Sequence, residues 1–179
     1  MNLIVDRQIE LKELAVDDAD VIFKTIDSQR EYLGEWLPFI AHTKAQSDTE
    51  NFIKAVCQQA IEERERTYTI WFENEFAGLI GFKGTDRLNG KTEIGYWLSQ
   101  HFQKRGIVTA SVKFLCRYAF KKLGMNRVQI KCAVGNVASE KIPIKLGFIF
   151  EGIERAGERV SEQLYFDLKV YSLLRSDNV

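Results

Sequence analysis

The sequence has few cysteines, prolines and histidines, and these shortages exclude several classes of protein. Its 179 residues include 3 cysteines, 2 prolines and 2 histidines. Cys57, Cys116 and Cys132 lie far apart and form no CxxC pair, which argues against a disulfide framework and favours a reducing compartment. Because no cluster of histidines, cysteines and carboxylates has the spacing of metal ligands, we expect no bound metal.

Net charge and long hydrophobic runs are also lacking. Lys+Arg and Asp+Glu are both 25, so no overall field attracts nucleic acid or an anionic membrane. The longest apolar run is far shorter than the ~20 residues that span a bilayer, and Asp6 brings a charge too early for a secretory signal. We therefore expect a cytoplasmic protein that binds neither nucleic acid nor membrane.

The order of the apolar patterns predicts an α+β fold. Hairpins before a central amphipathic helix and a β-α-β crossover after it imply a mixed, mostly antiparallel twisted sheet of about seven strands flanked by about four helices. The expected strands cover residues 9–14, 68–72, 76–83, 92–98, 128–134, 148–153 and 164–173, and the expected helices begin near residue 16 and run over 47–64, 105–122 and 136–147. The motifs GxGxxG and GxxxxGK[ST] are absent, which removes the main support for a dinucleotide or P-loop site.

The stretch from Glu93 to Val108 reads as a strand, an irregular turn and the start of a helix. The N-terminus of a helix presents unpaired backbone N–H groups and the positive end of its dipole, which favour phosphate oxygens. Lys104 and Arg105 add two positive charges beside the turn at Gly106. Taken alone, the stretch is either a pyrophosphate site or an ordinary surface loop.

A second block, from Asn136 to Phe148, favours the first reading. The segment Gln103–Val108 resembles the Q/R-x-x-G-x-G/A loop of the GNAT family of N-acetyltransferases, which binds the pyrophosphate of coenzyme A. The second block resembles the N-x-x-S…K-x-G-F segment of the same family. Val108 departs from the broad family, which has Gly or Ala there, although the RimL branch accepts a branched residue.

The resemblance is greater to the RimJ/RimL branch, which acetylates the N-termini of ribosomal proteins. The shared features are the Glu93–Trp97 strand, the Trp36–Pro38 turn and the Gly147–Gly152 strand. The resemblance implies one N-acetyltransferase domain over residues 1–179, with acetyl-CoA as co-substrate. Relatives of this type are often homodimers, which favours a homodimer here.

The implied reaction is direct attack of a primary amine on acetyl-CoA in a ternary complex, with the N-terminal α-amine of a protein as the expected acceptor. An α-amine titrates near ~8 and a lysine near ~10.4, so an N-terminal acceptor is partly neutral at cellular pH. Two alternatives stay open. The acceptor is a small molecule such as a polyamine, an amino acid or an antibiotic, or the chain binds acyl-CoA without catalysis. Fold resemblance does not decide between them.

Two glutamates compete for the role of general base. Glu93 lies on the strand before the loop, where the histone-type branch carries its catalytic glutamate, and Glu158 follows Ser139 at the spacing found in RimL enzymes. The alternatives are a structural strand residue for Glu93 and a charge in a mobile loop, residues 154–159, for Glu158. A water relay between the two carboxylates is a further alternative.

The remaining expected roles also follow from the resemblance. Ser139 is the expected proton donor to the coenzyme A sulfur, or only a helix first-turn serine, and the backbone N–H of Leu98, at a bulge, faces the thioester carbonyl. Residues 36–39 form a wall of the acceptor site, a core plug or a dimer contact, and Cys132 is a buried strand residue rather than a nucleophile. The expected acetyl-CoA contacts are Leu98, Gln103, Lys104, Arg105, Gly106, Ile107, Val108, Thr109, Asn136, which also suits an N-cap, and Ser139.

Overall fold

The computed structural model describes residues 2–58 and 66–177. Within these ranges, 8 strands are hydrogen-bonded in the order β1-β2-β3-β4-β5-β6-β8-β7. Strands β5 and β6 are parallel, and the other pairs whose register is defined are antiparallel. The predicted mixed α+β sheet is confirmed, with one strand and one helix more than expected, because the short β1 and α2 carry too few residues to show a period.

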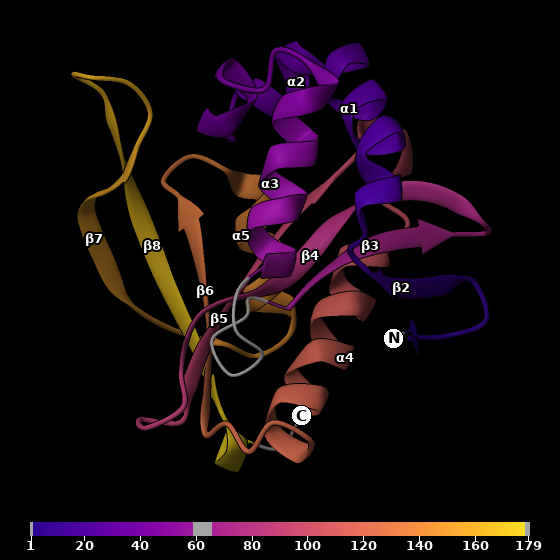
Figure 1. Cartoon of the computed structure of the whole chain (residues 1–179). Coiled ribbons are helices and arrows are strands. Elements are labelled where there is room, and N and C mark those ends of the chain that lie inside the picture. The colour runs from indigo at the N-terminus through magenta and orange to yellow at the C-terminus, as the bar shows by residue number, and fades with distance from the viewer. Residues whose placement is uncertain (1, 59–65, 178–179) are drawn as a thin grey trace. The chain divides into compact units, whose positions relative to one another are not determined.

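The chain divides into two compact units, the first of which comprises Met1–Phe82 and Tyr96–Ile107. Figure 1 labels α1, α2, α3, β2, β3, β4 and β5. Its elements are β1 (Asn2–Ile4), β2 (Ile9–Glu13), η1 (Val16–Asp18), α1 (Ala19–Ser28), α2 (Arg30–Gly34), η2 (Pro38–Ala41), α3 (Gln46–Gln58), β3 (Thr67–Phe72), most of β4 (Glu75–Asp86), the end of β5 (Lys91–Leu98) and η3 (Gln100–Phe102).

Helices α1, α2 and α3 bury their apolar faces in the core of the first unit. Residues recurring every three or four positions, such as Ile22 and Ile26, give each helix one apolar face. Across from them, Phe76 and Trp97 meet edge to face with ring centroids 5.9 Å apart. The cluster comprises Leu14, Ala19, Ile22, Ile26, Leu33, Ile40, Ile53, Val56, Phe76, Leu79 and Trp97.

Helix α3 begins at Gln46, one residue before the predicted start at Ser47. The reason is the carboxylate of Asp48, which accepts hydrogen bonds from the backbone N–H groups of Lys44 at 2.8 Å and Ala45 at 2.9 Å. An acidic side chain that reaches back in this way satisfies N–H groups that the first turn leaves unpaired. The predicted continuation over residues 59–64 lies outside the described residues.

The second unit comprises Lys83–Gly95 and Val108–Val179. Its elements are the remainder of β4 and β5, α4 (Ile107–Lys121), β6 (Arg127–Ala133), α5 (Val137–Lys145), β7 (Ile149–Arg159), β8 (Tyr165–Leu174) and η4 (Arg175–Asp177). The predicted stripe on α4 is confirmed, because Val112, Leu115 and Ala119 are all fully buried. Figure 1 shows β7 and β8 as a long antiparallel hairpin at the end of the chain.

Strand β6 separates a buried face from a polar one. Val128 and Ile130 are buried, while Arg127, Gln129 and Lys131 are only half-buried. Since successive side chains of a strand point to opposite sides of a sheet, these three polar residues share one face. This polar face carries the residues around Glu93.

Candidate active site

The loop between β5 and α4 contains two residues in the left-handed region of φ. Lys104 and Gly106 have φ angles of 62° and 78°. Left-handed residues that alternate with right-handed ones turn successive backbone N–H groups toward one side. A Cβ at Gly106 would meet nothing within 4 Å. Glycine is therefore favoured there by its φ angle and not by lack of space. This geometry supports the predicted phosphate-binding loop.

The side chains of the loop divide into two groups. The guanidinium of Arg105 lies 5.6 Å from the ring centre of Phe72 and 5.5 Å from that of Phe102, within cation–π range. Ile107 and Val108 are buried, so among the expected ligand contacts they offer only backbone N–H groups. The positive charges of the loop are thus carried by the exposed residues Lys104 and Arg105, and the Arg105 guanidinium lies beside two aromatic rings.

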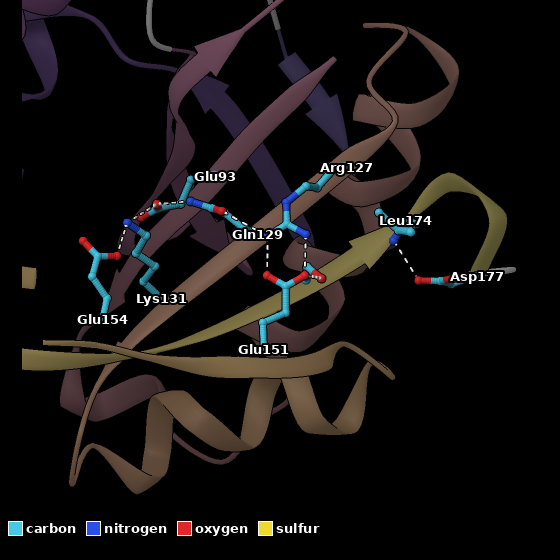
Figure 2. Close-up of polar contacts among 9 residues, drawn as sticks. Glu93, Arg127, Gln129, Lys131, Glu151, Glu154, Leu174 and Asp177 are labelled. Carbon is cyan, nitrogen blue, oxygen red and sulfur yellow. Dashed lines mark hydrogen bonds and ion pairs between the residues drawn. The ribbon is translucent and has the colours of Figure 1, made fainter. Parts of the chain in front are cut away.

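Glu93 is a buried carboxylate, 8% exposed, held by three side chains of neighbouring strands. One oxygen lies 2.9 Å from the ammonium of Lys83. The other accepts a hydrogen bond from the Gln129 amide at 2.9 Å and lies 3.8 Å from the ammonium of Lys131. Lys131 in turn contacts Glu154 at 2.6 Å, as Figure 2 shows. Both oxygens of Glu93 are therefore engaged, which supports the structural alternative for this residue.

Glu158 lies on strand β7 and not in a mobile loop. The expected loop over residues 154–159 was wrong, because Glu158 pairs with Phe166 of β8 after an irregularity in the register. The irregularity is stabilised by Asp167, whose carboxylate accepts a hydrogen bond from the backbone N–H of Ala156 at 2.7 Å. The strand thereby places the Glu158 carboxylate in a defined, half-buried position.

Burial raises the pKa of Glu158, and the charge of Lys83 partly opposes this effect while that of Glu93 adds to it. The structure therefore brings the two candidate bases close enough for the charge of Glu93 to act on Glu158. A carboxylate with a raised pKa is a stronger base once it is ionised. On these grounds Glu158 suits the role of base better than Glu93.

Asn136 and Ser139 stand at the start of α5. The side-chain oxygen of Asn136 accepts a hydrogen bond from the backbone N–H of Ser139 at 3.1 Å, so the predicted N-cap is confirmed. The hydroxyl of Ser139 donates to the sulfur of Cys132 at 3.4 Å. Cys132 is buried on β6, as expected, and burial raises the pKa of its thiol. A protonated thiol is a poor nucleophile.

Helix α5 is tied to β8 by a contact that the sequence does not predict. One oxygen of Glu140 accepts hydrogen bonds from Lys169 and from the hydroxyl of Tyr171, both at 2.6 Å. Burial and the neighbouring Glu140 raise the pKa of Tyr171 to about 12, so its hydroxyl stays a donor at neutral pH. Because Glu140 directly follows Ser139, this contact fixes the first turn that carries the serine.

Glu151 makes a bidentate pair with Arg127 at the other end of the polar face. Its two oxygens lie 2.6 and 2.5 Å from the guanidinium nitrogens, and Ser172 donates to one of them at 2.7 Å (Figure 2). The Arg127 hydrogen bond, with smaller help from Ser172, lowers the pKa of Glu151 from 4.5 to about 2. The pair therefore ties β6 to β7 over most of the accessible pH range.

This pair predicts a pH-dependent loss of stability. A depressed pKa stabilises the fold above the unfolded value, and the effect is lost as pH falls from 4.5 to about 2. Glu151→Gln should lower the free energy of unfolding by about 1 kcal/mol at pH 7, since solvent screens a partly exposed pair. Urea unfolding at several pH values measures the difference in the free energy of unfolding between the variant and the wild type. A difference from wild type that does not shrink below pH 4.5 would contradict the assignment.

The partners of Glu93 were not predicted as site residues. Lys83 lies on β4, and Gln129 and Lys131 lie on β6. Their alternation with buried residues on β6 is visible in the sequence and indicates a polar face. What the sequence lacks is the pairing of β5 with β6, which brings Gln129 level with Glu93.

The aromatic turn at residues 36–39 contributes to the core of the first unit. Leu37 packs against the core cluster and Ile40, just after the turn, is 3% exposed. Phe39 is 43% exposed. The core-plug reading is confirmed for Leu37, and Phe39 is the side chain of this turn that faces solvent.

Over residues 2–58 and 66–177, no helix is long and apolar enough to cross a membrane. The same residues contain no group of three or more histidines, cysteines, aspartates or glutamates placed to hold a metal ion.

Comparison with known proteins relates this geometry to a family. The model of the acetyltransferase (GNAT) domain matches residues 8–149. A Bacillus subtilis protein named "Putative ribosomal N-acetyltransferase YdaF" is 34% identical over 97% of this chain and 94% of its own length. The ribosomal-protein-serine acetyltransferase of Escherichia coli is 26% identical over 94% of this chain and 93% of its own length.

A solved structure shows the same fold. The microcin C7 self-immunity acetyltransferase MccE, in complex with acetyl-CoA and AMP, superposes with a TM-score of 0.88 at 27% identity, covering 95% of this chain and 94% of that one. The family model covers more than half of the chain. The chain therefore belongs to the GNAT family of acetyltransferases and is an N-acetyltransferase.

Proposed function

We propose that the chain transfers an acetyl group from acetyl-CoA to the N-terminal α-amine of a protein, such as a ribosomal protein. The observation that carries the proposal is the half-buried carboxylate of Glu158, near a second carboxylate, Glu93, whose oxygens are engaged by lysines. The names of the Bacillus subtilis and Escherichia coli relatives support a ribosomal acceptor. The MccE complex supports acetyl-CoA as co-substrate.

The loop from Gln103 to Thr109 would hold the pyrophosphate of coenzyme A. Backbone N–H groups around Lys104 and Gly106 supply donors, and the exposed ammonium of Lys104 supplies charge. Asn136, the N-cap of α5, would contact coenzyme A through the N–H groups of its side-chain amide.

Each chemical step then has a residue. Acetyl-CoA supplies the thioester, whose C–S bond breaks as the acceptor nitrogen bonds the carbonyl carbon. The Glu158 carboxylate takes a proton from the acceptor amine, and the backbone N–H of Leu98 stabilises charge on the carbonyl oxygen. The hydroxyl of Ser139 gives the departing sulfur a proton, and the proton that Glu158 took from the amine returns to the Ser139 oxygen through solvent, so both residues regain their starting states. The products are an N-acetyl group and free coenzyme A.

Acetyl-CoA should raise the melting temperature of the chain by about 8 °C at a concentration near one hundred times its Kd, because it binds only the folded state. ATP and NAD serve as controls and should produce no comparable shift. A single transition that shifts as a whole is expected if residues 1–179 act as one domain. Absence of a shift with acetyl-CoA would contradict the proposal.

A second assay separates catalysis from binding. Free thiol should appear when acetyl-CoA and a peptide with a free N-terminal amine are both present, and a peptide with a blocked N-terminus is the control. A polyamine and an amino acid test the alternative of a small acceptor. Stronger turnover of these small amines than of the peptide would replace the protein acceptor by a small one.

We further propose that the protein acts in the cytoplasm and as a homodimer. The exposed apolar side chains of Ile149, Phe150 and Ile153 on β7 support self-association.

A further inference from the structure

Gln29 lies at the junction of α1 and α2 and reaches the loop that follows β5. It is both the C-cap of α1 and the N-cap of α2, with φ of −136° and ψ of 29°. Its side-chain oxygen accepts a hydrogen bond from the backbone N–H of Gln100 at 2.8 Å. Its side-chain nitrogen donates to the hydroxyl of Ser99 at 3.1 Å. Both ends of one amide are thus used on two successive loop residues.

Tyr32 lies three residues later and contacts the two ends of the same loop segment. Its hydroxyl accepts a hydrogen bond from the Gln103 amide at 2.6 Å and donates to the carbonyl of Leu98 at 3.4 Å. The ring packs against the core cluster of the first unit. Burial raises the pKa of Tyr32, so the hydroxyl keeps its proton at neutral pH. The ring position is therefore fixed by the core, and the hydroxyl is held against the loop.

The four contacts bracket residues 98–103, which carry two of the residues assigned to acetyl-CoA. Leu98 is the expected donor to the thioester carbonyl, and Gln103 opens the pyrophosphate loop. A separate bond, from the backbone N–H of Ser99 to the carbonyl of Ala77 at 2.8 Å, holds the end of β5. The segment is therefore anchored to the sheet without Gln29 and Tyr32, which instead restrict the conformations open to it.

We propose that Gln29 and Tyr32 are positioning residues that hold residues 98–103 ready for acetyl-CoA, and this inference rests on the proposed function. Gln29 joins α1 to α2 and Tyr32 lies on α2, so both residues come about seventy positions before the loop in the chain. A loop held in its binding conformation loses less conformational freedom when the ligand arrives. The expected consequence is tighter binding of acetyl-CoA, without any direct contact between the ligand and either residue.

The test measures the Kd for acetyl-CoA by calorimetry in Tyr32→Phe and Gln29→Ala. Each variant loses the side-chain hydrogen bonds that the residue makes to the loop, and we expect Kd to rise roughly fivefold in each. The KM for the acceptor should stay within about twofold of wild type, which a general loss of folding would not produce. Gln29→Glu should restore Kd to near the wild-type value, because one carboxylate oxygen still accepts from the Gln100 N–H and the other takes the place of the amide nitrogen, accepting a hydrogen bond from the Ser99 hydroxyl.

Gln46→Ala is the matched control, since it removes an exposed amide contact, to Glu50 at 3.1 Å, within α3. Its Kd should equal that of the wild type. If Tyr32→Phe and Gln29→Ala also bind acetyl-CoA as tightly as wild type, the positioning role is overturned while the proposed function stands. If the wild type itself binds no acetyl-CoA, the proposed function falls and the positioning role falls with it.

Discussion

Glu158→Gln is expected to lower kcat by about 100- to 10,000-fold, because loss of a general base typically costs two to four orders of magnitude. Glutamine keeps the size and half-buried position of the side chain but cannot take a proton. The Kd for acetyl-CoA should be unchanged, since Glu158 is assigned to the acceptor amine. Stopped-flow or steady-state thiol release measures kcat, and the melting temperature checks that the variant is folded.

The pH dependence of kcat gives an independent reading of the same residue. A base acts only when ionised, so the rate should rise with pH through the pKa of Glu158, which burial raises. Lys83→Met removes a positive charge that lowers this pKa, and the rising limb should move to higher pH. Lys24→Met, on an exposed helix pair with Asp20, is the control and should leave the profile in place.

Glu93→Gln should have the opposite effect on the profile. The charge of Glu93 raises the pKa of Glu158, so its removal moves the rising limb to lower pH, and kcat should fall much less than in Glu158→Gln. If Glu93→Gln abolishes turnover while Glu158→Gln does not, the roles of the two glutamates are reversed. If both variants keep full activity, neither carboxylate is the base.

The features that the sequence predicts are those set by local patterns. The helix over residues 105–122 carries an apolar stripe of its own, and Asn136 caps α5 through a bond to a residue three positions away. The strand that ends at Leu98 and the turn at Gly106 likewise depend on neighbours in sequence. Interactions between residues a few positions apart can be predicted, because the spacing of apolar and capping residues is visible in the sequence.

The features that could not be predicted depend on which strands become neighbours. Glu93 receives Lys83 from β4 and Gln129 from β6, and neither partner is marked by its own local pattern as part of a site. Glu158 looked like a loop residue because charges and glycines surround it, yet hydrogen bonds to β8 override this weak local preference. Register between distant strands is decided by the whole sheet.

The close approach of two strands near Leu98 leads to a further expected result, for stability. Strand β4 carries a β-bulge, since Ile70 pairs with Gly78 and Trp71 with Phe76, which leaves Ala77 as the extra residue. The carbonyl of Ala77 thereby accepts the hydrogen bond from Ser99. The resemblance implies a bulge beside Leu98 on β5, which stays a prediction, and the register shift against β3 lies on the neighbouring strand β4.

Gly78→Ala is expected to lower the free energy of unfolding by about 3 kcal/mol and the melting temperature by about 10 °C. An added Cβ would lie 2.2 Å from the carbonyl oxygen of Trp97 and 3.0 Å from the Cα of Leu98. Both are backbone atoms, so relief requires the two strands to separate. Thermal and urea unfolding measure the loss, and residual activity reports on the position of Leu98.

Gly34→Ala is the matched control for this substitution. A Cβ there would meet only the side chain of Ile40, at an ordinary contact distance of 3.8 Å. Because Gly34 ends helix α2, alanine should stabilise the fold by up to about 1 kcal/mol. A Gly78→Ala protein as stable as wild type would show that β4 and β5 have room for a methyl group.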